Sequence, residues 1–267
     1  MENQIWLDWL PMWAIFLLTI AVVMLSIWIG TVLGNRRRRR PEHESESSLG
    51  TIIGATLGLL GFLLVFTFGL AAERLQARKQ LLLSEINAIG TTYLRAGLLL
   101  EPHKSEIRKL LREYVDIRAN LAKEKTSLLE KIREARQRSD LLQDQMWQHA
   151  EAIAKADRSS EIDALFINSL NEMIDLQTSR VTVFKYRIPT TIWNVLFFIT
   201  ILSMVTVGYQ AGLSGKSCFK IGIVLALTFA IVILLIVDLD RAIEGSLRVS
   251  QKPMLELQKK LEFSTQK

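Results

Sequence analysis

The residues with the clearest potential for chemistry stand near the C-terminus. In the stretch "FAIVILLIVDLDRAIEGSLRVSQKP", a long aliphatic run ends at the acidic residues Asp238, Asp240 and Glu244. Carboxylates at the end of an apolar helix could form a ring that concentrates or holds cations. They could also be interfacial structure, in which Glu244 pairs with Arg241 or Arg248 three or four residues away. Asp238 and Asp240 lie about 200° apart around a helix, so they do not form a simple paired site, and both interpretations stay open.

A second candidate region is the apolar segment "GTIIGATLGLLGFLLVFTFGLAAERLQ". At about 100° per residue, one helix face carries four glycines and a valine, which we call the small-residue face: Gly54, Gly58, Gly61, Val65 and Gly69. The opposite face is bulky and aliphatic. Small residues let membrane helices approach closely, so this face predicts either helix packing or the lining of a pore in an oligomer. In the second case the flanking rings of Phe62, Phe66 and Phe68 could form a hydrophobic constriction.

Motifs for catalysis or metal binding are not found in the sequence. The histidines His43, His103 and His149 are scattered, and the single cysteine, Cys218, has no partner at metal-ligand spacing. Phosphate-binding loops, dinucleotide fingerprints, nucleophile elbows and metalloprotease motifs are also missing. The sequence therefore predicts no metal site, no cofactor and no enzymatic activity.

The distribution of apolar residues determines the fold class. Of the 267 residues, 49% are hydrophobic, and they fall in long blocks rather than in an amphipathic pattern. About 20 apolar residues are needed to cross roughly 30 Å of hydrocarbon. Four segments meet this requirement, at about residues 11–33, 51–72, 189–213 and 219–237. We predict an all-α, multi-pass membrane protein with four transmembrane helices.

The remaining segments complete a predicted domain organisation. Leu, Ala, Glu, Lys, Arg and Gln dominate residues 73–187, and apolar positions recur there with a helical period. This pattern predicts a bundle of long helices inserted between spans two and three, whose first and last helices continue into those spans. One of them should begin at Ser160, which with Asp163 resembles a capping box. The predicted order is an N-terminal transmembrane hairpin, an extramembrane helical domain, a C-terminal hairpin and an amphipathic tail, at residues 1–72, 73–187, 188–238 and 239–267.

Positive charge is concentrated beside the first span. The formal charge is +6, and much of the excess lies in one run: Arg36, Arg37, Arg38, Arg39 and Arg40. Such a run next to a span sets topology or meets anionic lipid, so we expect no nucleic-acid partner. The positive-inside rule would place this loop in the cytoplasm and residues 73–187 outside. Arg74, Lys79 and Arg187 flank the membrane on that outer side, so the opposite orientation also stays open.

Several stretches together carry a family resemblance. "LLIVDLDRAIEGSLRVSQKPMLEL", "GATLGLLGFLLVFTFGLAAERLQARKQLLLSEINAIGTTYLRAGLL", "LREYVDIR", "SLNEMIDLQTSRV" and "RIPTTIWNVLF" resemble the bestrophin-like domain family in the expected order. This family consists mostly of bacterial four-span membrane proteins without an assigned activity. Its name refers to the bestrophins, ring-forming anion channels whose second membrane segment lines the pore. By that analogy the resemblance implies that residues 54–69 line a pore.

Two functions are compatible with these observations. The first is a homo-oligomeric, ion-channel-like protein of the cell membrane, expected to be the bacterial inner membrane, with the second span near the pore axis. The alternative is a non-conducting sensor or scaffold that is anchored in the lipid bilayer and binds a protein partner through its helical domain. Ion flux through the purified protein would distinguish the two.

Overall fold

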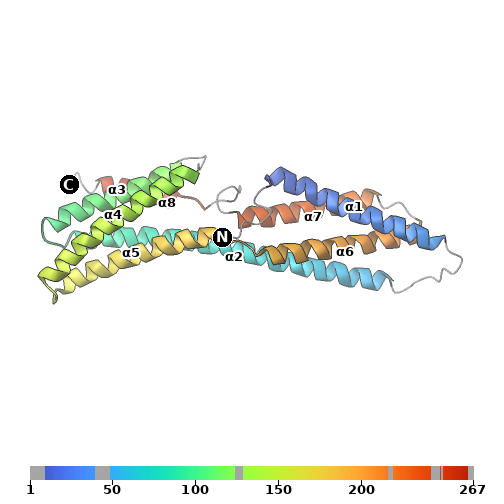
Figure 1. Cartoon of the computed structure of the whole chain (residues 1–267), viewed down its shortest axis with the longest axis horizontal. Coiled ribbons are helices and arrows are strands. Elements are labelled where there is room, and N and C mark those ends of the chain that lie inside the picture. The colour runs from blue at the N-terminus through green and yellow to red at the C-terminus, as the bar shows by residue number, and fades with distance from the viewer. Residues whose placement is uncertain are drawn as a thin grey trace. The chain divides into compact units, whose positions relative to one another are not determined.

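The computed structural model describes residues 10–39, 49–123, 129–215, 219–241, 247 and 249–263. All regular structure in these ranges is helical, which confirms the predicted all-α class (Figure 1). The helices are α1 (Met12–Arg38), α2 (Leu49–Ala96), α3 (His103–Lys123), α4 (Leu129–Ala156), α5 (Glu161–Lys185), α6 (Thr190–Ser214), α7 (Phe219–Asp240) and α8 (Lys252–Phe263).

The chain divides into two compact units. The membrane unit contains Met1–Leu75 and Arg187–Leu247, and the helical unit contains Gln76–Tyr186 and Arg248–Lys267. Four helices, α1, α2, α6 and α7, are long and apolar enough to cross a membrane. They include the four spans that the sequence predicts, and the protein is a membrane protein of the multi-span helical type.

The membrane unit is built around a core to which all four of its helices contribute. The largest buried side chain is that of Trp193 on α6, and it packs in one cluster with Ile15 of α1 and Ile233 of α7. Helix α2 contributes Leu60 and Leu64, which lie on the bulky aliphatic face expected from the sequence. The orientation of α2 in this unit therefore follows from burying its large side chains.

Helices α1 and α6 approach each other through glycines that the sequence analysis did not single out. Gly30 and Gly34 of α1 meet the α6 backbone, and Gly208 and Gly212 of α6 meet the α1 backbone. A Cβ atom at any of these positions would overlap a backbone atom of the facing helix. This spacing of small residues, four apart on each helix, allows the close contact that stabilises helix pairs in lipid.

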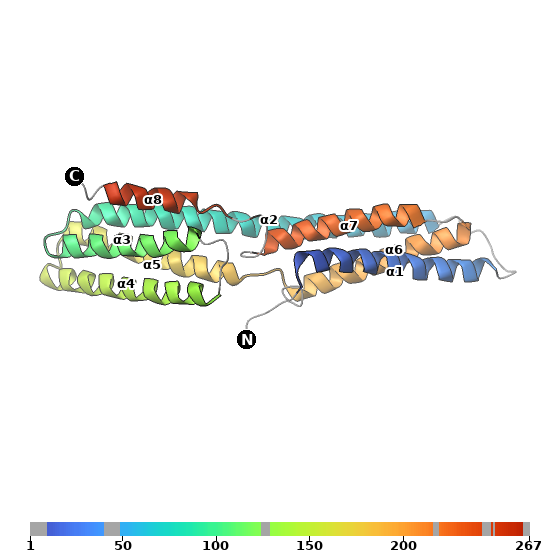
Figure 2. The same ribbon diagram turned by 90° about the horizontal axis from the view of Figure 1, so that it is seen from above.

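The helical unit consists of the second part of α2 with α3, α4, α5 and α8. Its core contains Tyr114 of α3, Met146 of α4 and Phe166 of α5, all fully buried. Helix α3 packs against both α4 and α8, and α8 contributes Met254 and Leu257 to the same core (Figure 2). The amphipathic C-terminal segment therefore packs against the helices of this unit.

Helix boundaries confirm one prediction and contradict another. Ser160 caps α5, because its hydroxyl accepts the backbone N–H of Asp163 at 3.2 Å. The prediction that the last helix of the domain continues into the third span was wrong. Helix α5 ends at Lys185, Tyr186 has an extended backbone, and α6 begins after Pro189. Proline lacks an N–H and disfavours a helical conformation in the residue before it, which explains the break. Helix α2, in contrast, is continuous from Leu49 to Ala96, as predicted.

Candidate functional site

The small-residue face of α2 has no packing partner among the described residues of the chain. Val65 is 72% exposed. A Cβ atom added at Gly54, Gly58, Gly61 or Gly69 would have no neighbour within 4 Å among the residues that the structure describes. Packing of this face inside one chain is therefore excluded for the described residues. What remains is contact with another subunit, with lipid or with the contents of a pore.

The three phenylalanines beside this face are also directed away from the core of the membrane unit. Phe62 is 66% exposed, Phe66 54% and Phe68 39%. Their rings are separate from the buried cluster that contains Leu60 and Leu64. Helix α2 therefore presents an outer surface of glycine, valine and phenylalanine, with neither charge nor hydrogen-bonding side chains at these positions.

The acidic cluster after α7 has a structural explanation for its described members. The Asp240 carboxylate accepts the N–H of Ile188, with Oδ1 at 3.1 Å and Oδ2 at 3.3 Å, and lies 3.7 Å from the Arg74 guanidinium. The backbone oxygen of Asp240 accepts a hydrogen bond from Arg187 at 2.6 Å. Because Ile188 precedes α6 and Arg74 belongs to α2, Asp240 connects three helices of the membrane unit.

Two residues close to Asp240 in the chain, Asp238 and Arg241, also form hydrogen bonds to backbone groups. Asp238 accepts the N–H of Leu247 at 3.2 Å, and Arg241 donates to the backbone oxygen of Leu10 at 2.6 Å. The Asp238, Asp240 and Arg241 side chains are all buried. These contacts favour the interpretation as interfacial structure over a cation-holding ring, because protein donors occupy the carboxylates. Glu244, Arg248 and Arg40 lie outside the described residues.

The described part of the arginine run lies at the C-terminal end of α1. Arg36, Arg37 and Arg38 form the last turn of α1, where positive charge is favourable to the helix dipole. The Arg38 guanidinium occupies the space that a side chain at Gly215 would need. Gly215 ends α6 with φ of 65°, a conformation that favours glycine. The run therefore also has a packing role next to the α6 terminus.

The helical unit contains a buried polar network that the sequence analysis missed. The Glu85 side chain is fully buried, with Arg180 Nε at 3.0 Å and Arg118 Nη2 at 3.5 Å from its Oε2 atom. The Tyr114 hydroxyl lies 3.1 Å from Glu85 Oε1 and 2.6 Å from Gln177 Oε1. Three side chains from α3 and α5 thus surround the Glu85 carboxylate of α2, and Gln177 extends the network through Tyr114.

Burial dominates the electrostatics of this network, which lies outside the membrane-spanning part of α2. Burial raises the pKa of Glu85, against the opposing effects of Arg118 and of the Tyr114 hydrogen bond. Burial, and then the Glu85 charge, raise the pKa of Tyr114 well above its ordinary value. In the sequence, Glu85 stands between Ser84 and Ile86 on a long helix of mixed polar and apolar residues, so no motif distinguishes it from a solvent-exposed glutamate.

Two of the scattered histidines meet in the structure. Nδ1 of His103, at the start of α3, lies 3.0 Å from Nδ1 of His149 on α4. The rings are edge to face, with centroids 5.2 Å apart. These histidines are scattered in the sequence, but the fold brings two of them together. The two residues are 46 positions apart in the chain, so local spacing could not indicate the pair.

Comparison with known proteins identifies the family. The profile of the bestrophin-like domain matches residues 14–254, which is most of the chain. The chain belongs to the bestrophin-like domain family. Crystal structures of a bacterial bestrophin homologue from Klebsiella pneumoniae, in three point-mutant forms, share its fold with TM-scores of 0.63 to 0.65. Each match covers 94% of this chain and 99% of the other, at 12% sequence identity. A search of the curated proteins found no significant match.

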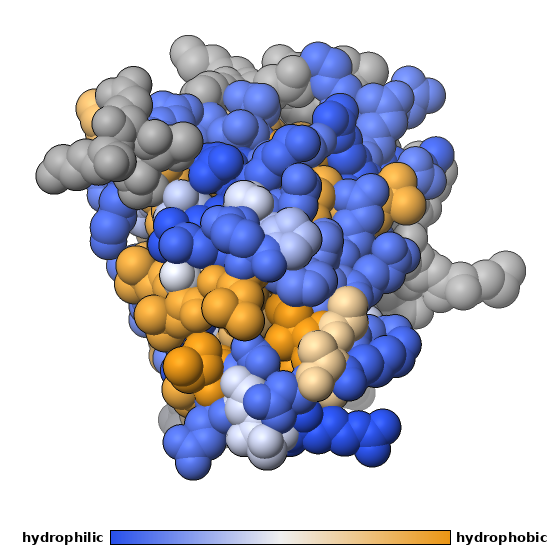
Figure 3. Space-filling view, turned by 90° about the vertical axis from the view of Figure 1, so that its left-hand side faces the viewer, coloured by the Kyte–Doolittle hydropathy of each residue, from blue (hydrophilic) through white to orange (hydrophobic). Residues whose placement is uncertain are grey.

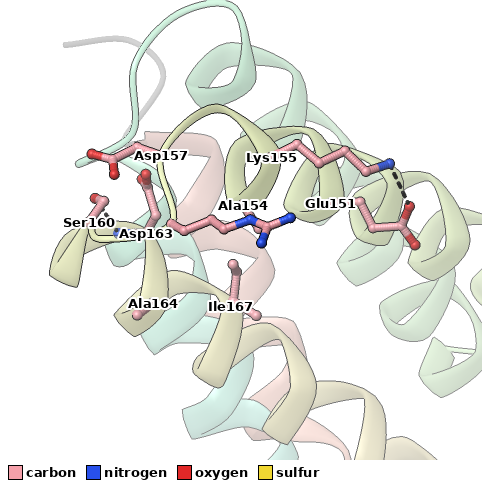
Figure 4. A pocket seen from close by; sticks show the side chains of 9 residues that line it. Glu151, Ala154, Lys155, Asp157, Ser160, Asp163, Ala164 and Ile167 are labelled. Carbon is pink, nitrogen blue, oxygen red and sulfur yellow. Dashed lines mark hydrogen bonds and ion pairs between the residues drawn. The ribbon is translucent and has the colours of Figure 1, made fainter.

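This bestrophin-like chain also has a hollow of about 400 Å³ at the turn between α4 and α5. Figure 4 shows Glu151 and Lys155 paired on one side, at 3.6 Å, and Asp157, Ser160 and Asp163 on the other. A hydrogen bond from Ser159 is the largest of the effects that lower the pKa of Asp157. Three carboxylates and two cations line the hollow, and this excess of a single negative charge gives little selection for an ionic ligand.

The surface of the helical unit carries both hydrophobic and hydrophilic residues. Figure 3 shows hydrophobic surface beside hydrophilic surface on the face toward the left of Figure 1. Leu94, Leu98 and Leu100 are exposed leucines near the end of α2 in this unit, the last of them 85% exposed. Elsewhere on the described residues, no group of three or more His, Cys, Asp or Glu side chains is arranged to hold a metal ion.

Proposed function

We propose that this protein is a homo-oligomeric ion channel of the cell membrane, in which the small-residue face of α2 is directed toward the axis of the ring. The observation that carries the proposal is the unpartnered state of this face. Four glycines and an exposed valine follow one side of an apolar helix whose other side is buried in its own chain. Packing inside the chain explains why the buried face of α2 carries leucines. It does not explain why the exposed face carries glycines.

The family supports this assignment. In the bestrophins, which the family resembles, the second membrane segment lines the pore, and the small-residue face lies on the second span of this chain. The fold shared with the bacterial bestrophin homologue extends over almost the whole chain. The family also agrees with the expectation that the protein is not an enzyme.

The chemistry of the α2 surface indicates how such a pore would work. Glycines leave space for hydrated ions, whereas Phe62, Phe66 and Phe68 would narrow the pore with apolar rings. Hydrophobic constrictions gate by dewetting, so a narrow passage lined by these rings would open when they separate. The absence of charge at these eight positions means that ion selectivity would have to come from residues elsewhere in the ring.

The alternative is the anchored sensor or scaffold. It is favoured by the exposed leucines of the helical unit, Leu94, Leu98 and Leu100, which could contact a protein partner. In this alternative α2 would contact lipid or a second chain without forming a pore. For either function, we propose that the protein resides in the bacterial inner membrane with the arginine run Arg36–Arg40 in the cytoplasm.

The test has two stages, with a matched control. The full chain is purified in mild detergent, its subunits are counted by native mass, and ion flux is measured after reconstitution in liposomes. The account predicts a ring of four or more subunits and a specific flux that Gly58→Leu and Gly61→Leu reduce. Val224→Leu is the control, because Val224 is 63% exposed on α7 and is not part of the small-residue face. A monomer or dimer without flux would refute the channel and favour the scaffold.

A further inference from the structure

The His103–His149 pair forms a small polar site that the proposed channel function does not use. It is located in the helical unit, where the N-terminus of α3 lies beside the second half of α4. Both side chains are partly exposed, so an ion from solution can reach them. Their Nδ1 atoms are 3.0 Å apart, and each of these nitrogens carries either a proton or a lone pair directed at the other.

This geometry is close to that of two imidazoles on one metal ion. Zinc binds histidine nitrogens at about 2.0–2.1 Å in a tetrahedral arrangement, which places two such nitrogens roughly 3.3 Å apart. Cis ligands of square-planar copper, at similar bond lengths, are about 2.9 Å apart. The observed separation lies between these values. A metal ion beside the line joining the two nitrogens would therefore leave their separation almost unchanged, with each ring turned so that its lone pair points at the ion.

We propose that His103 and His149 bind a transition-metal ion, such as Zn²⁺ or Cu²⁺, and that this ion connects α3 to α4. Among the described residues no third ligand is in place, so water would complete the coordination. Glu106 stands one turn further along α3, and its charge acts on His149. It would make the site more attractive to a cation.

The protonation of the pair supports metal binding near neutral pH. Partial burial, and then the adjacent His103, lower the pKa of His149, while Glu106 acts in the opposite direction. Only the neutral imidazole binds metal, so the affinity of the pair is expected to fall as the pH is lowered. In the metal-free pair, one Nδ1 carries a proton and the other a lone pair directed at it. When metal binds Nδ1 of both neutral rings, the Nδ1 proton is replaced by one on Nε2 of the same ring, so each imidazole stays neutral and no net proton is released.

The experiment uses the full chain without a polyhistidine tag, stripped of metal and purified in detergent. Zn²⁺ is titrated at pH 7.5 and followed by calorimetry. We expect one ion per chain, with affinity reduced roughly tenfold or more in His103→Ala and in His149→Ala, since even the loss of an outer-shell partner costs that much. The affinity should also fall at pH 5.5. His43→Ala is the matched control, because His43 is the only other histidine, and it should bind as the unmodified chain does.

A second measurement does not depend on the folding of the variants. Electron paramagnetic resonance of the unmodified chain with one equivalent of Cu²⁺ should show two coordinated nitrogen atoms. Zn²⁺ affinity that survives in both alanine variants, affinity lost only in His43→Ala, or a copper spectrum without two nitrogens would each overturn the proposal. None of these outcomes depends on whether the protein conducts ions, so this inference and the channel proposal can fail separately.

Discussion

Two sets of glycines in the membrane unit have opposite surroundings. The glycines of α1 and α6 are in contact with a facing backbone, so that a Cβ atom at Gly30 or Gly208 would overlap it. The glycines of α2 are open, and a Cβ atom at Gly58 would touch nothing described in the chain. The same residue type therefore completes the packing of one helix pair and leaves another helix surface available. This difference indicates which helix surface is available to a second subunit in the proposed oligomer.

The largest loss of stability is expected for a substitution in the contact between α1 and α6. Gly208→Leu would force a side chain into the backbone oxygen of Ile27. Overpacking of a core costs about 1–3 kcal/mol even where side chains can move, and here a backbone would have to move. We expect the loss of folded, monodisperse protein, measured by size exclusion and circular dichroism in detergent. Gly58→Leu makes the same change on the open face and should retain both signals.

If Gly208→Leu purified like the unmodified chain, the contact between α1 and α6 would not require glycine. The contrast between the packed glycines of α1 and α6 and the open glycines of α2 would then no longer hold.

The next effect concerns the helical unit, whose apolar core encloses a buried ion-pair network. Glu85→Ala would leave Arg118 and Arg180 without their buried carboxylate. Removing one partner of a buried ion pair costs about 3–5 kcal/mol. We expect this variant to unfold at a lower temperature and to be cleaved faster by protease within residues 76–186. Equal protease resistance of both proteins would mean that the network does not support this unit.

The pH dependence of the same residue gives a smaller and more specific effect. Because the folded pKa of Glu85 is raised above its ordinary value of 4.5, the folded state holds this proton more tightly than the unfolded state. Its contribution to stability is present below pH 4.5 and is lost as the pH rises through the folded pKa. Glu85→Gln, which cannot ionise, should remove this part of the pH dependence from thermal unfolding curves. A pH dependence that is the same in Glu85→Gln and the unmodified chain would contradict the raised pKa of Glu85 in the folded state.

The smallest predicted effect concerns the aromatic residues beside the open face. If Phe66 narrows a pore, Phe66→Ala should raise ion flux in liposomes by a few-fold without changing the subunit count. Phe198→Ala on α6 is the control, because its ring is similarly exposed in the membrane unit at 65% but lies away from α2's small-residue face. A rise of the same size in both variants would mean that the effect is not specific to the pore.

The two faces of α2 could be predicted from helical periodicity. At about 100° per residue, Gly58 and Leu60 fall on different faces, and in the structure Leu60 is buried while Gly58 is open. The same approach could not find Gly30 and Gly208, because their significance depends on which two helices meet. The choice of partner helix is determined by three-dimensional packing and leaves no signal within a single apolar segment.

The polar sites were harder to predict for the same reason. Glu85, Arg118 and Arg180 come from three helices, and each of them resembles a solvent-exposed residue in its own sequence context. His103 and His149 meet only because α3 and α4 pack together. For Asp238 and Asp240, the sequence correctly predicted that they are not a simple pair, but it could not show that backbone N–H groups would engage both carboxylates.

The central claim is that the open face of α2 lines a pore. The most direct test is ion flux through Gly58→Cys in a Cys218→Ser background, which removes the only native cysteine, before and after a charged thiol reagent is added. Val224→Cys on α7 serves as the control. The account predicts flux that the reagent reduces strongly in Gly58→Cys and leaves unchanged in the control. Flux that persists after complete labelling of Gly58→Cys, or no flux in any variant, would contradict it.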